Sequence, residues 1–304
     1  MDPRRRALLA CLAAGALGQE PRPSFADDRI MTKAIPSTGE ALPVIGVGTW
    51  QTFDAGKDPG ARAPLAEVLK LMTKAGHGVV DSSPMYGSSE TVAGDLIAEH
   101  GLRDRLFIAT KVWTHGREAG IEQMQTSFRR LRVKRMDLMQ VHNLADVETH
   151  TKTLLEMKYG KKLRYIGITH YTSSAYPAVE RALETGHYDF LQINYSLGER
   201  ESEKRLLPLA REMKIAVIAN RPFAEGALFR QVKGKPLPSW AAELGIASWA
   251  QYFLKWIVSH PAVTCAIPGT GNPKHMQDNL NAGRGSLPNA GMRKKMAEYF
   301  DAER

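Results

Sequence analysis

The sequence is poor in cysteine and has no long uncharged hydrophobic stretch. Its two cysteines, Cys11 and Cys265, cannot form a disulfide framework, and no CxxC, HExxH or paired Cys/His spacing offers a metal site. The longest uncharged stretch near a terminus, residues 7–18, is too short to cross the roughly 30 Å hydrocarbon layer of a bilayer. The sequence therefore predicts a protein without structural metal, disulfide scaffold or membrane span.

Acidic residues are outnumbered, since 32 Asp and Glu face 41 Lys and Arg and leave a formal net charge of +9. Such a surplus suits anionic ligands, including nucleic acid. Beyond the amino-terminal segment, however, the basic residues are scattered rather than run together, which argues against a nucleic-acid groove. A hydrophobic share of 43% in 304 residues is enough to fill a sizeable core, so a globular chain is favoured over a disordered one.

The first 26 residues have the parts of an export signal. Arg4–Arg6 precede an apolar run rich in Ala and Gly over residues 7–18, and Ser24–Ala26 suits cleavage. Adjacent arginines before such a run resemble a twin-arginine signal, which exports folded proteins from bacteria. We expect residues 1–26 to be a signal peptide and residues 27–304 to form a single domain of an exported or periplasmic protein. An uncleaved tail on a cytoplasmic protein is the alternative.

Short apolar runs recur along the rest of the chain, separated by segments with helical spacing. Their interval is close to the roughly 30 residues that one strand and its crossover helix require. Between the first two runs, Leu65, Val68 and Met72 follow the spacing of one helix face. Eight such units predict a closed (β/α)8 TIM barrel. The eight runs are residues 44–48, 79–81, 106–111, 137–142, 165–169, 190–194, 215–220 and 263–268.

Two further segments lie outside this repeat. A doubly wound open sheet would use the same unit, but its Gly-rich dinucleotide fingerprint is missing. Before the first run, Ser37–Glu40 lies between short apolar flanks and predicts a β-hairpin that covers the bottom of the barrel. Before the last run, residues 221–241 are rich in Gly and Pro and predict a lid over the upper mouth. The aromatic residues of this segment are Phe223, Phe229 and Trp240.

Polar residues end most of the apolar runs, at the face where a parallel barrel places its reactive groups. Lys111 lies near the barrel interior, where an ammonium is unfavourable without a carboxylate, and Asp81 at the end of the preceding run is the natural partner. Tyr86 follows in the next loop, and His142 ends the run after Lys111. A phenol has a pKa near ~10, and we expect the Lys111 ammonium to lower it. Tyrosine beside lysine and histidine can protonate an alkoxide as it forms from a carbonyl.

These segments resemble the motifs of the aldo/keto reductase family, and the likeness runs from about residue 31 to the carboxyl end. The resemblance implies hydride transfer from a nicotinamide to a small aldehyde or ketone. It also implies that Tyr86 is the general acid, that Lys111 and His142 tune and orient it, and that Asp81 holds Lys111. The matching segments are residues 42–50, 81–87, 110–113 and 138–142.

The same resemblance implies which residues hold the nicotinamide half of the cofactor. Thr169, His170 and Gln192 would bind the carboxamide, with His170 at a place where the family often has Asn. Where the family commonly shows Tyr-Ser-Pro-Leu, this chain has Asn220 and Arg221 followed by Pro and Phe. The stacking tyrosine is therefore replaced, and the planar guanidinium of Arg221 is suited to stack on the ring or to bind the pyrophosphate.

The last apolar run leads into a segment that resembles the family's motif for the adenosine phosphate. Thr270, Lys274, His275 and Asn279 are its candidate contacts, together with the amino end of the following helix. The family's usual lysine is Gly269 here, and its usual arginine is His275. We expect NADPH to be preferred over NADH, with NADH as the alternative.

Trp50, Trp113 and His115 are candidates for the substrate wall by the same resemblance, and an aromatic wall suits apolar carbonyl compounds. A second function is a cofactor-binding regulatory or partner subunit that keeps the barrel but has little turnover. An unrelated barrel hydrolase built on Asp81 and His142 is disfavoured, because the sequence has no nucleophile elbow or metal cluster.

Overall fold

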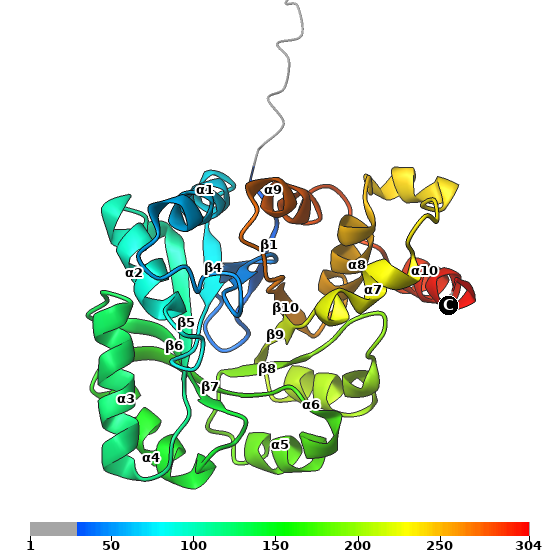
Figure 1. The fold of residues 1–304 in the computed structure, drawn as a ribbon. Helices are drawn as coiled ribbons and strands as arrows, with labels where there is room; N and C mark the ends of the chain where they lie inside the picture. The colour runs from blue at the N-terminus through cyan, green and yellow to red at the C-terminus, as the bar shows by residue number, and fades with distance from the viewer. Residues whose placement is uncertain (1–28, 304) are drawn as a thin grey trace, which may run out of the picture.

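The computed structural model describes residues 29–303 and shows an eight-stranded parallel barrel (Figure 1). Each strand pairs with its neighbours along the chain. Parallel bridges from Ile45 to Ala266 and from Gly48 to Gly269 join the first strand to the last, so the sheet closes. The predicted (β/α)8 TIM barrel is thereby confirmed. Its strands are β3 (Val47–Gly48), β4 (Gly78–Asp81), β5 (Leu106–Val112), β6 (Met136–His142), β7 (Leu163–His170), β8 (Phe190–Asn194), β9 (Ala216–Asn220) and β10 (Val263–Ala266).

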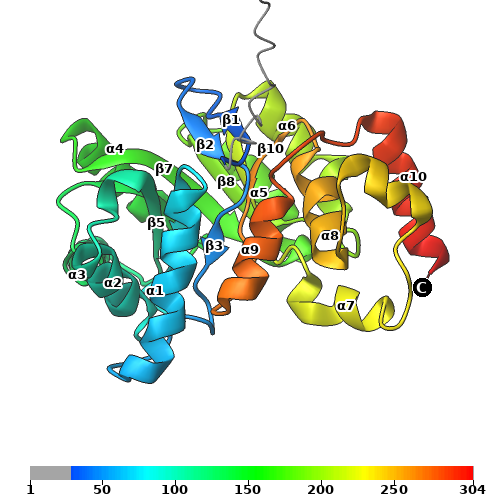
Figure 2. The same cartoon turned by 90° about the horizontal axis from the view of Figure 1, so that it is seen from above.

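Helices surround the sheet, and the helix after the last strand packs against the helix after the first, as Figure 2 shows for α9 (Pro273–Asn281) and α1 (Pro59–Lys74). Local sequence explains where α1 begins, because the Asp58 side chain accepts a hydrogen bond from the Gly60 N–H and Pro59 occupies a position that needs no donor. The other helices are α2 (Ser89–Glu99), α3 (Arg117–Arg130), α4 (Val147–Tyr159), α5 (Tyr176–Leu183), α6 (Leu206–Glu212), α7 (Ala227–Gln231), α8 (Trp249–Val258) and α10 (Ala290–Ala302).

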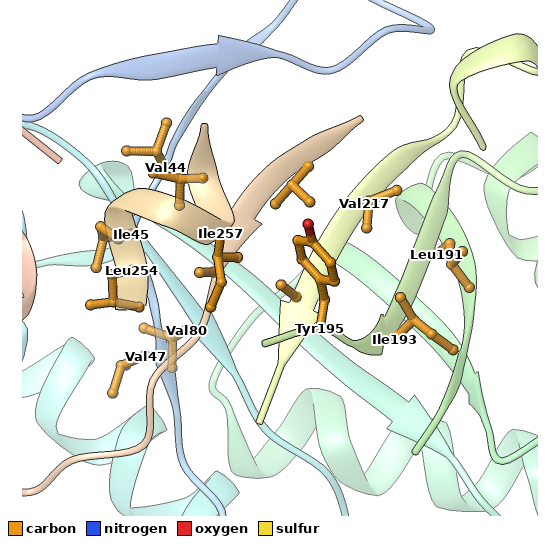
Figure 3. Close-up of a cluster of buried hydrophobic side chains, with 14 of the residues drawn as sticks. Val44, Ile45, Val47, Val80, Leu191, Ile193, Tyr195, Val217, Leu254 and Ile257 are labelled. Carbon is orange, nitrogen blue, oxygen red and sulfur yellow. The ribbon is translucent and has the colours of Figure 1, made fainter. Parts of the chain in front are cut away.

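Strand side chains alternate between two apolar layers, because successive residues of a strand point to opposite faces. The larger layer lies between the barrel and the helices. Figure 3 shows part of it, where Leu254 and Ile257 of α8 lie beside Val44 and Ile45. The smaller layer fills the lower barrel and contains Ile35, Leu42, Val79, Phe107, Ala109, Leu138, Tyr165, Phe190, Ala216, Ile218, Cys265 and Ile267.

A β-hairpin closes the amino-terminal mouth of the barrel. Ile35 and Leu42 from the hairpin belong to the apolar layer inside the barrel. At the hairpin's outer edge, the Tyr165 hydroxyl donates to the Glu40 carboxylate at 2.6 Å. The hairpin is therefore a plug that separates the bottom of the barrel from water. Its strands, β1 (Thr32–Ala34) and β2 (Ala41–Pro43), are antiparallel.

Residues 1–28 and 304 are not among the described residues. The expected signal peptide, residues 1–26, falls in this part, so the signal and its cleavage stay predictions. Within residues 29–303, no helix is long and apolar enough to cross a membrane. The same residues contain no group of three or more His, Cys, Asp or Glu side chains placed to hold a metal ion.

Candidate active site

A polar layer lies directly above the apolar filling of the barrel. On β5, Phe107 and Ala109 point inward, and Lys111 follows them with the same parity. Each member of the layer is at most 2% exposed. The strands thus bring four polar side chains together at the carboxyl-terminal end of the barrel. The other three members are Asp81 of β4, Gln140 of β6 and Gln192 of β8.

Asp81 and Lys111 form a buried ion pair, as the sequence analysis expects. The Lys111 ammonium donates to Oδ2 of Asp81 and to the carbonyl oxygen of Ser82, each at 2.7 Å. Burial lowers the pKa of Lys111, but the Asp81 carboxylate and the Tyr86 phenol raise it more, so the pKa lies above its ordinary value. Lys111 therefore keeps its positive charge inside the barrel.

Tyr86 reaches this ion pair from the loop between β4 and α2. The Lys111 ammonium lies 5.0 Å from the centroid of the Tyr86 ring, and the ring meets that of His142 edge-on at 6.1 Å between centroids. Tyrosine, lysine and histidine from three consecutive strand ends thus surround one point. A positioned phenol beside an ammonium is the arrangement that proton donation to a carbonyl oxygen requires.

The expected lowering of the Tyr86 pKa is wrong in its net sign. Burial raises the pKa of Tyr86, the Lys111 ammonium lowers it, and the Asp81 carboxylate raises it again. The sum lies above the ordinary value because removal from water penalises the phenolate more than one ammonium compensates. Tyr86 is therefore held in its protonated form, and Lys111 limits the cost of losing that proton.

His142 is a neutral group in this site. Burial and the charge of Lys111 lower its pKa to about 3, with a further contribution from His170. Its Nδ1 lies 3.2 Å from the hydroxyl of Ser83, a residue that the sequence analysis did not single out. A neutral imidazole can orient a carbonyl oxygen by a hydrogen bond without placing a second cation beside Lys111.

The loop that carries Tyr86 is fastened to the loop after β3. Gly87 has a φ of +58°, and a Cβ there would lie 2.3 Å from Oδ2 of Asp54. The backbone N–H and the hydroxyl of Ser88 donate to Oδ1 of Asp54 at 2.8 and 2.7 Å. Glycine is thus required next to the phenol, and Asp54 anchors the turn that aims it.

These side chains form the floor of a cavity of about 830 Å³, a size that suits a small-molecule ligand. The residues of the sequence analysis that line it are Trp50, Asp81, Tyr86, Lys111, Trp113, His142, Thr169, Gln192, Asn220, Arg221, Phe223 and Phe229. Asn143 and Tyr171 also line it, although the sequence analysis passed over them. Only the first part of the expected lid reaches the cavity, because Trp240 packs instead against Tyr252 and Tyr299 at 6.0 Å between ring centroids.

Among the candidates for the nicotinamide and the substrate wall, His170 and His115 do not line the cavity. His170 follows Thr169 and so has the opposite parity in β7. Its Nδ1 accepts the Thr172 N–H at 3.1 Å, and its ring stacks on that of Tyr171. His115 lies in the exposed turn before α3. Neither residue lines the cavity, so their contacts with cofactor and substrate stay predictions.

Of the candidates for the adenosine phosphate, Thr270, Lys274 and His275 lie before or at the start of α9, near Gly269 at the cavity edge, and Asn279 lies two turns further along the helix. Lys274 and His275 are exposed, whereas Thr270 and Asn279 are buried. The Asn272 side chain caps the helix by accepting the Lys274 N–H at 2.9 Å. Exposed basic side chains at a capped helix start provide a place for an anionic group beside the cavity.

Residues 44–294 match the model of the aldo/keto reductase family. The chain belongs to the aldo/keto reductase family. It is 29% identical over 256 residues to methylglyoxal reductase YeaE of Escherichia coli (strain K12), an alignment that covers 81% of this chain and 88% of that protein. An aldo/keto reductase from Klebsiella pneumoniae, crystallised in complex with NADP and acetate, has a TM-score of 0.76 and 25% identity, and the alignment covers 89% of this chain and 96% of that one.

Unpartnered polar atoms show that this aldo/keto reductase cavity fits a polar cofactor. Oδ1 of Asn143, Oδ1 of Asn220 and Nε of Arg221 are buried without a hydrogen-bond partner, and all three residues line the cavity. Buried groups of this kind call for a ligand or water. The Arg221 guanidinium lies 5.9 Å from the centroid of the Tyr171 ring and pairs with Glu225 at 2.9 Å. Amide groups, an aromatic ring and a guanidinium suit a nicotinamide nucleotide.

Proposed function

We propose that this aldo/keto reductase reduces small aldehydes or ketones to alcohols with NADPH, and that Tyr86 is the proton donor. The observation that supports this most is the ion pair of Lys111 and Asp81 directly under the Tyr86 ring, at the floor of the cavity. Methylglyoxal reductase YeaE and the Klebsiella pneumoniae protein crystallised with NADP support the same chemistry.

The chain's own residues supply position and charge for this reaction. Thr169 and Gln192 hold the carboxamide of the nicotinamide, and Arg221 holds its ring or the pyrophosphate. A reduced nicotinamide nucleotide held by these residues would be the source of the hydride for the carbonyl carbon. Tyr86 gives its proton to the carbonyl oxygen, and the Lys111 ammonium stabilises the phenolate that remains. Solvent returns the proton to Tyr86 after the alcohol leaves.

The cofactor preference rests on the start of α9. Lys274 and His275 are exposed there and can meet a 2′-phosphate, so we propose NADPH as the cofactor. Titration of the protein with each reduced cofactor, followed by protein fluorescence, decides between them. Equal or tighter binding of NADH would show that these side chains do not contact the phosphate.

Replacing Tyr86 by phenylalanine tests the proposed chemistry. With 4-nitrobenzaldehyde and NADPH, we expect Tyr86→Phe to lower kcat at least about 100-fold, because general acid catalysis contributes about 10²–10⁴. NADPH binding should change little, since the ring remains. The measurement is the loss of NADPH absorbance at 340 nm.

Tyr159→Phe is the matched control, because that ring is 93% exposed on α4 and should behave as the parent protein does. If the parent protein binds NADPH tightly but neither it nor Tyr86→Phe turns over the aldehyde, the result would indicate the regulatory or partner subunit instead.

A further inference from the structure

Gln140 lies at the centre of the polar layer and has no role in the reaction described above. It is fully buried on β6, which lies in the sheet between β5, the strand of Lys111, and β8, the strand of Gln192. Its Nε2 donates to Oδ1 of Asp81 at 3.3 Å and to Oε1 of Gln192 at 2.9 Å. Gln192 in turn donates from Nε2 to Oδ2 of Asp81 at 3.1 Å. The three side chains therefore form a closed ring of hydrogen bonds.

We propose that Gln140 is a positioning residue that couples the side chain holding the nicotinamide to the ion pair under the proton donor. This inference rests on the proposed function of the same site. Lys111 is fixed by Asp81, and the Gln192 amide is fixed by both Asp81 and Gln140. A change in the orientation of Gln192 therefore changes the hydrogen bonding of Asp81, and a change at Asp81 changes that of Gln192. The reason is that buried polar groups have no water to replace a lost partner.

The chemistry of the glutamine amide explains why this residue type stands here. Lysine or arginine would add a second cation beside Lys111, and a carboxylate would repel Asp81. The Gln140 amide instead directs an N–H dipole at Oδ1 of Asp81 while remaining neutral. Because Asp81 raises the pKa of Tyr86, an N–H directed at its carboxylate offsets part of the negative charge that acts on the phenol.

NADPH binding measured without turnover is the first test. Gln140→Met removes the donor at nearly constant volume and should weaken NADPH binding about 3- to 10-fold, the usual effect of one lost hydrogen bond. Gln192→Met should weaken it at least as much. If Gln140 acts through Gln192, the double variant binds no worse than Gln192→Met within about twofold.

Thr151→Val is the matched control for loss of a buried hydrogen bond. Its hydroxyl lies 2.5 Å from that of Tyr188 on the outside of the barrel, so the variant should lose stability but bind NADPH normally.

The pH profile of turnover separates positioning from mere loss of stability. Gln140→Met should lower the plateau of kcat about threefold to tenfold and move its alkaline limb to higher pH, with less than about twofold change in KM for the aldehyde. Without the Gln140 N–H, the Asp81 carboxylate is less compensated and raises the pKa of Tyr86 further. The other charged or titratable groups near Tyr86 and Asp81 are Lys111 of β5, His142 of β6 and Cys265 of β10. Asp54 holds the Tyr86 loop, and the Arg221–Glu225 pair after β9 lines the same cavity.

The outcomes distinguish this inference from the proposed function. If the parent protein turns over, Tyr86→Phe is inactive and Gln192→Met binds NADPH weakly, unchanged binding and pH profile in Gln140→Met overturn the role of Gln140 alone. Additive losses in the double variant also overturn it. If the parent protein does not bind NADPH, the proposed function fails and the inference with it.

Discussion

At the scale of single residues, burial decides which protonation states the site uses. Lys111 stays charged because Asp81 lies 2.7 Å away, whereas the half-buried His142 is neutral because burial and the charge of Lys111 both lower its pKa. Tyr86 keeps its proton although a cation lies below its ring. One cation, one carboxylate and two neutral groups thus share the floor of the cavity.

Removing the buried ammonium should be costly for folding. Lys111→Met leaves the Asp81 carboxylate buried without its cation, and we expect a loss of about 3–5 kcal/mol in the free energy of unfolding. Adding Asp81→Asn to the Lys111→Met variant should restore part of the lost free energy of unfolding. Lys255→Met is the control, because Lys255 is equally buried but donates to the carbonyl oxygens of Arg284 and Ser286. Urea denaturation of the parent protein and these three variants measures the losses. Equal losses of stability in Lys111→Met and Lys255→Met would contradict the ion-pair argument.

Two half-buried histidines that stay neutral should make the protein acid-sensitive. The pKa is lowered to about 3 in His142 and to about 4 in His260, mainly by burial. Unfolded histidine titrates near ~6.5, so between pH 6.5 and 4 the unfolded chain binds protons that the folded chain does not. Stability therefore falls as pH falls through this window, by at most about 1.4 kcal/mol per pH unit for each histidine.

Urea denaturation at several pH values between 7.5 and 4.5 measures this slope. His142→Asn should make it shallower, and His77→Asn, at an exposed position, should leave it unchanged. An unaltered slope in His142→Asn would mean that His142 titrates normally in the folded protein.

At the scale of elements, the two ends of the barrel have separate tasks. The hairpin of β1 and β2 seals the lower mouth with Ile35 and Leu42, whereas the strand ends and the loops after them build the cavity at the upper mouth. The Tyr86 loop depends on the loop after β3 through Asp54. Substitutions in the hairpin can therefore alter the stability of the barrel separately from the chemistry at the upper mouth.

Truncating the hairpin plug should show this separation. Leu42 is 1% exposed, and Leu42→Ala should cost about 2–5 kcal/mol by leaving a cavity in the lower barrel. Because the reactive groups lie at the opposite mouth, kcat and KM should stay within about twofold of the parent values below the melting temperature. A large loss of kcat in a folded Leu42→Ala protein would show that the plug also shapes the active site.

At the scale of the whole molecule, closure of the barrel is what makes the site. Strand ends from all parts of the chain meet only because β3 and β10 join. The described residues contain a lone free cysteine, the buried Cys265, so the barrel needs no oxidising compartment in order to fold. A folded barrel can carry a bound nicotinamide nucleotide through a pathway that exports folded proteins.

Export through the amino-terminal segment is the corresponding prediction. We expect the full chain, expressed in a bacterium, to appear in the periplasmic fraction with an amino terminus near Ala26. Replacing Arg4–Arg6 by lysines should retain it in the cytoplasm, because the twin-arginine pathway reads the arginines themselves. Cell fractionation and sequencing of the mature amino terminus measure both. A parent protein found in the cytosol with Met1 intact would refute export.

Much of the fold was predictable from local patterns. Recurring short apolar runs and helical spacing indicate the eight strands and their helices, and turn residues indicate the hairpin, because each depends only on neighbours in the chain. The motif residues Asp81, Tyr86, Lys111 and His142 end or follow strands, so their meeting at one mouth follows from barrel topology. The contact of His170 with the cofactor stays a prediction, because a motif does not reveal on which face of β7 its side chain lies.

The sequence by itself determined the barrel, its plug and the set of residues at its upper mouth, since local propensity and strand order are written along the chain. Only the tertiary structure decided that Gln140 joins Asp81 to Gln192, that His115 stays in water, and that Tyr86 keeps its proton. These features depend on burial and on distances of a few ångströms between residues far apart in sequence, because electrostatic energies in a water-poor interior change steeply with both.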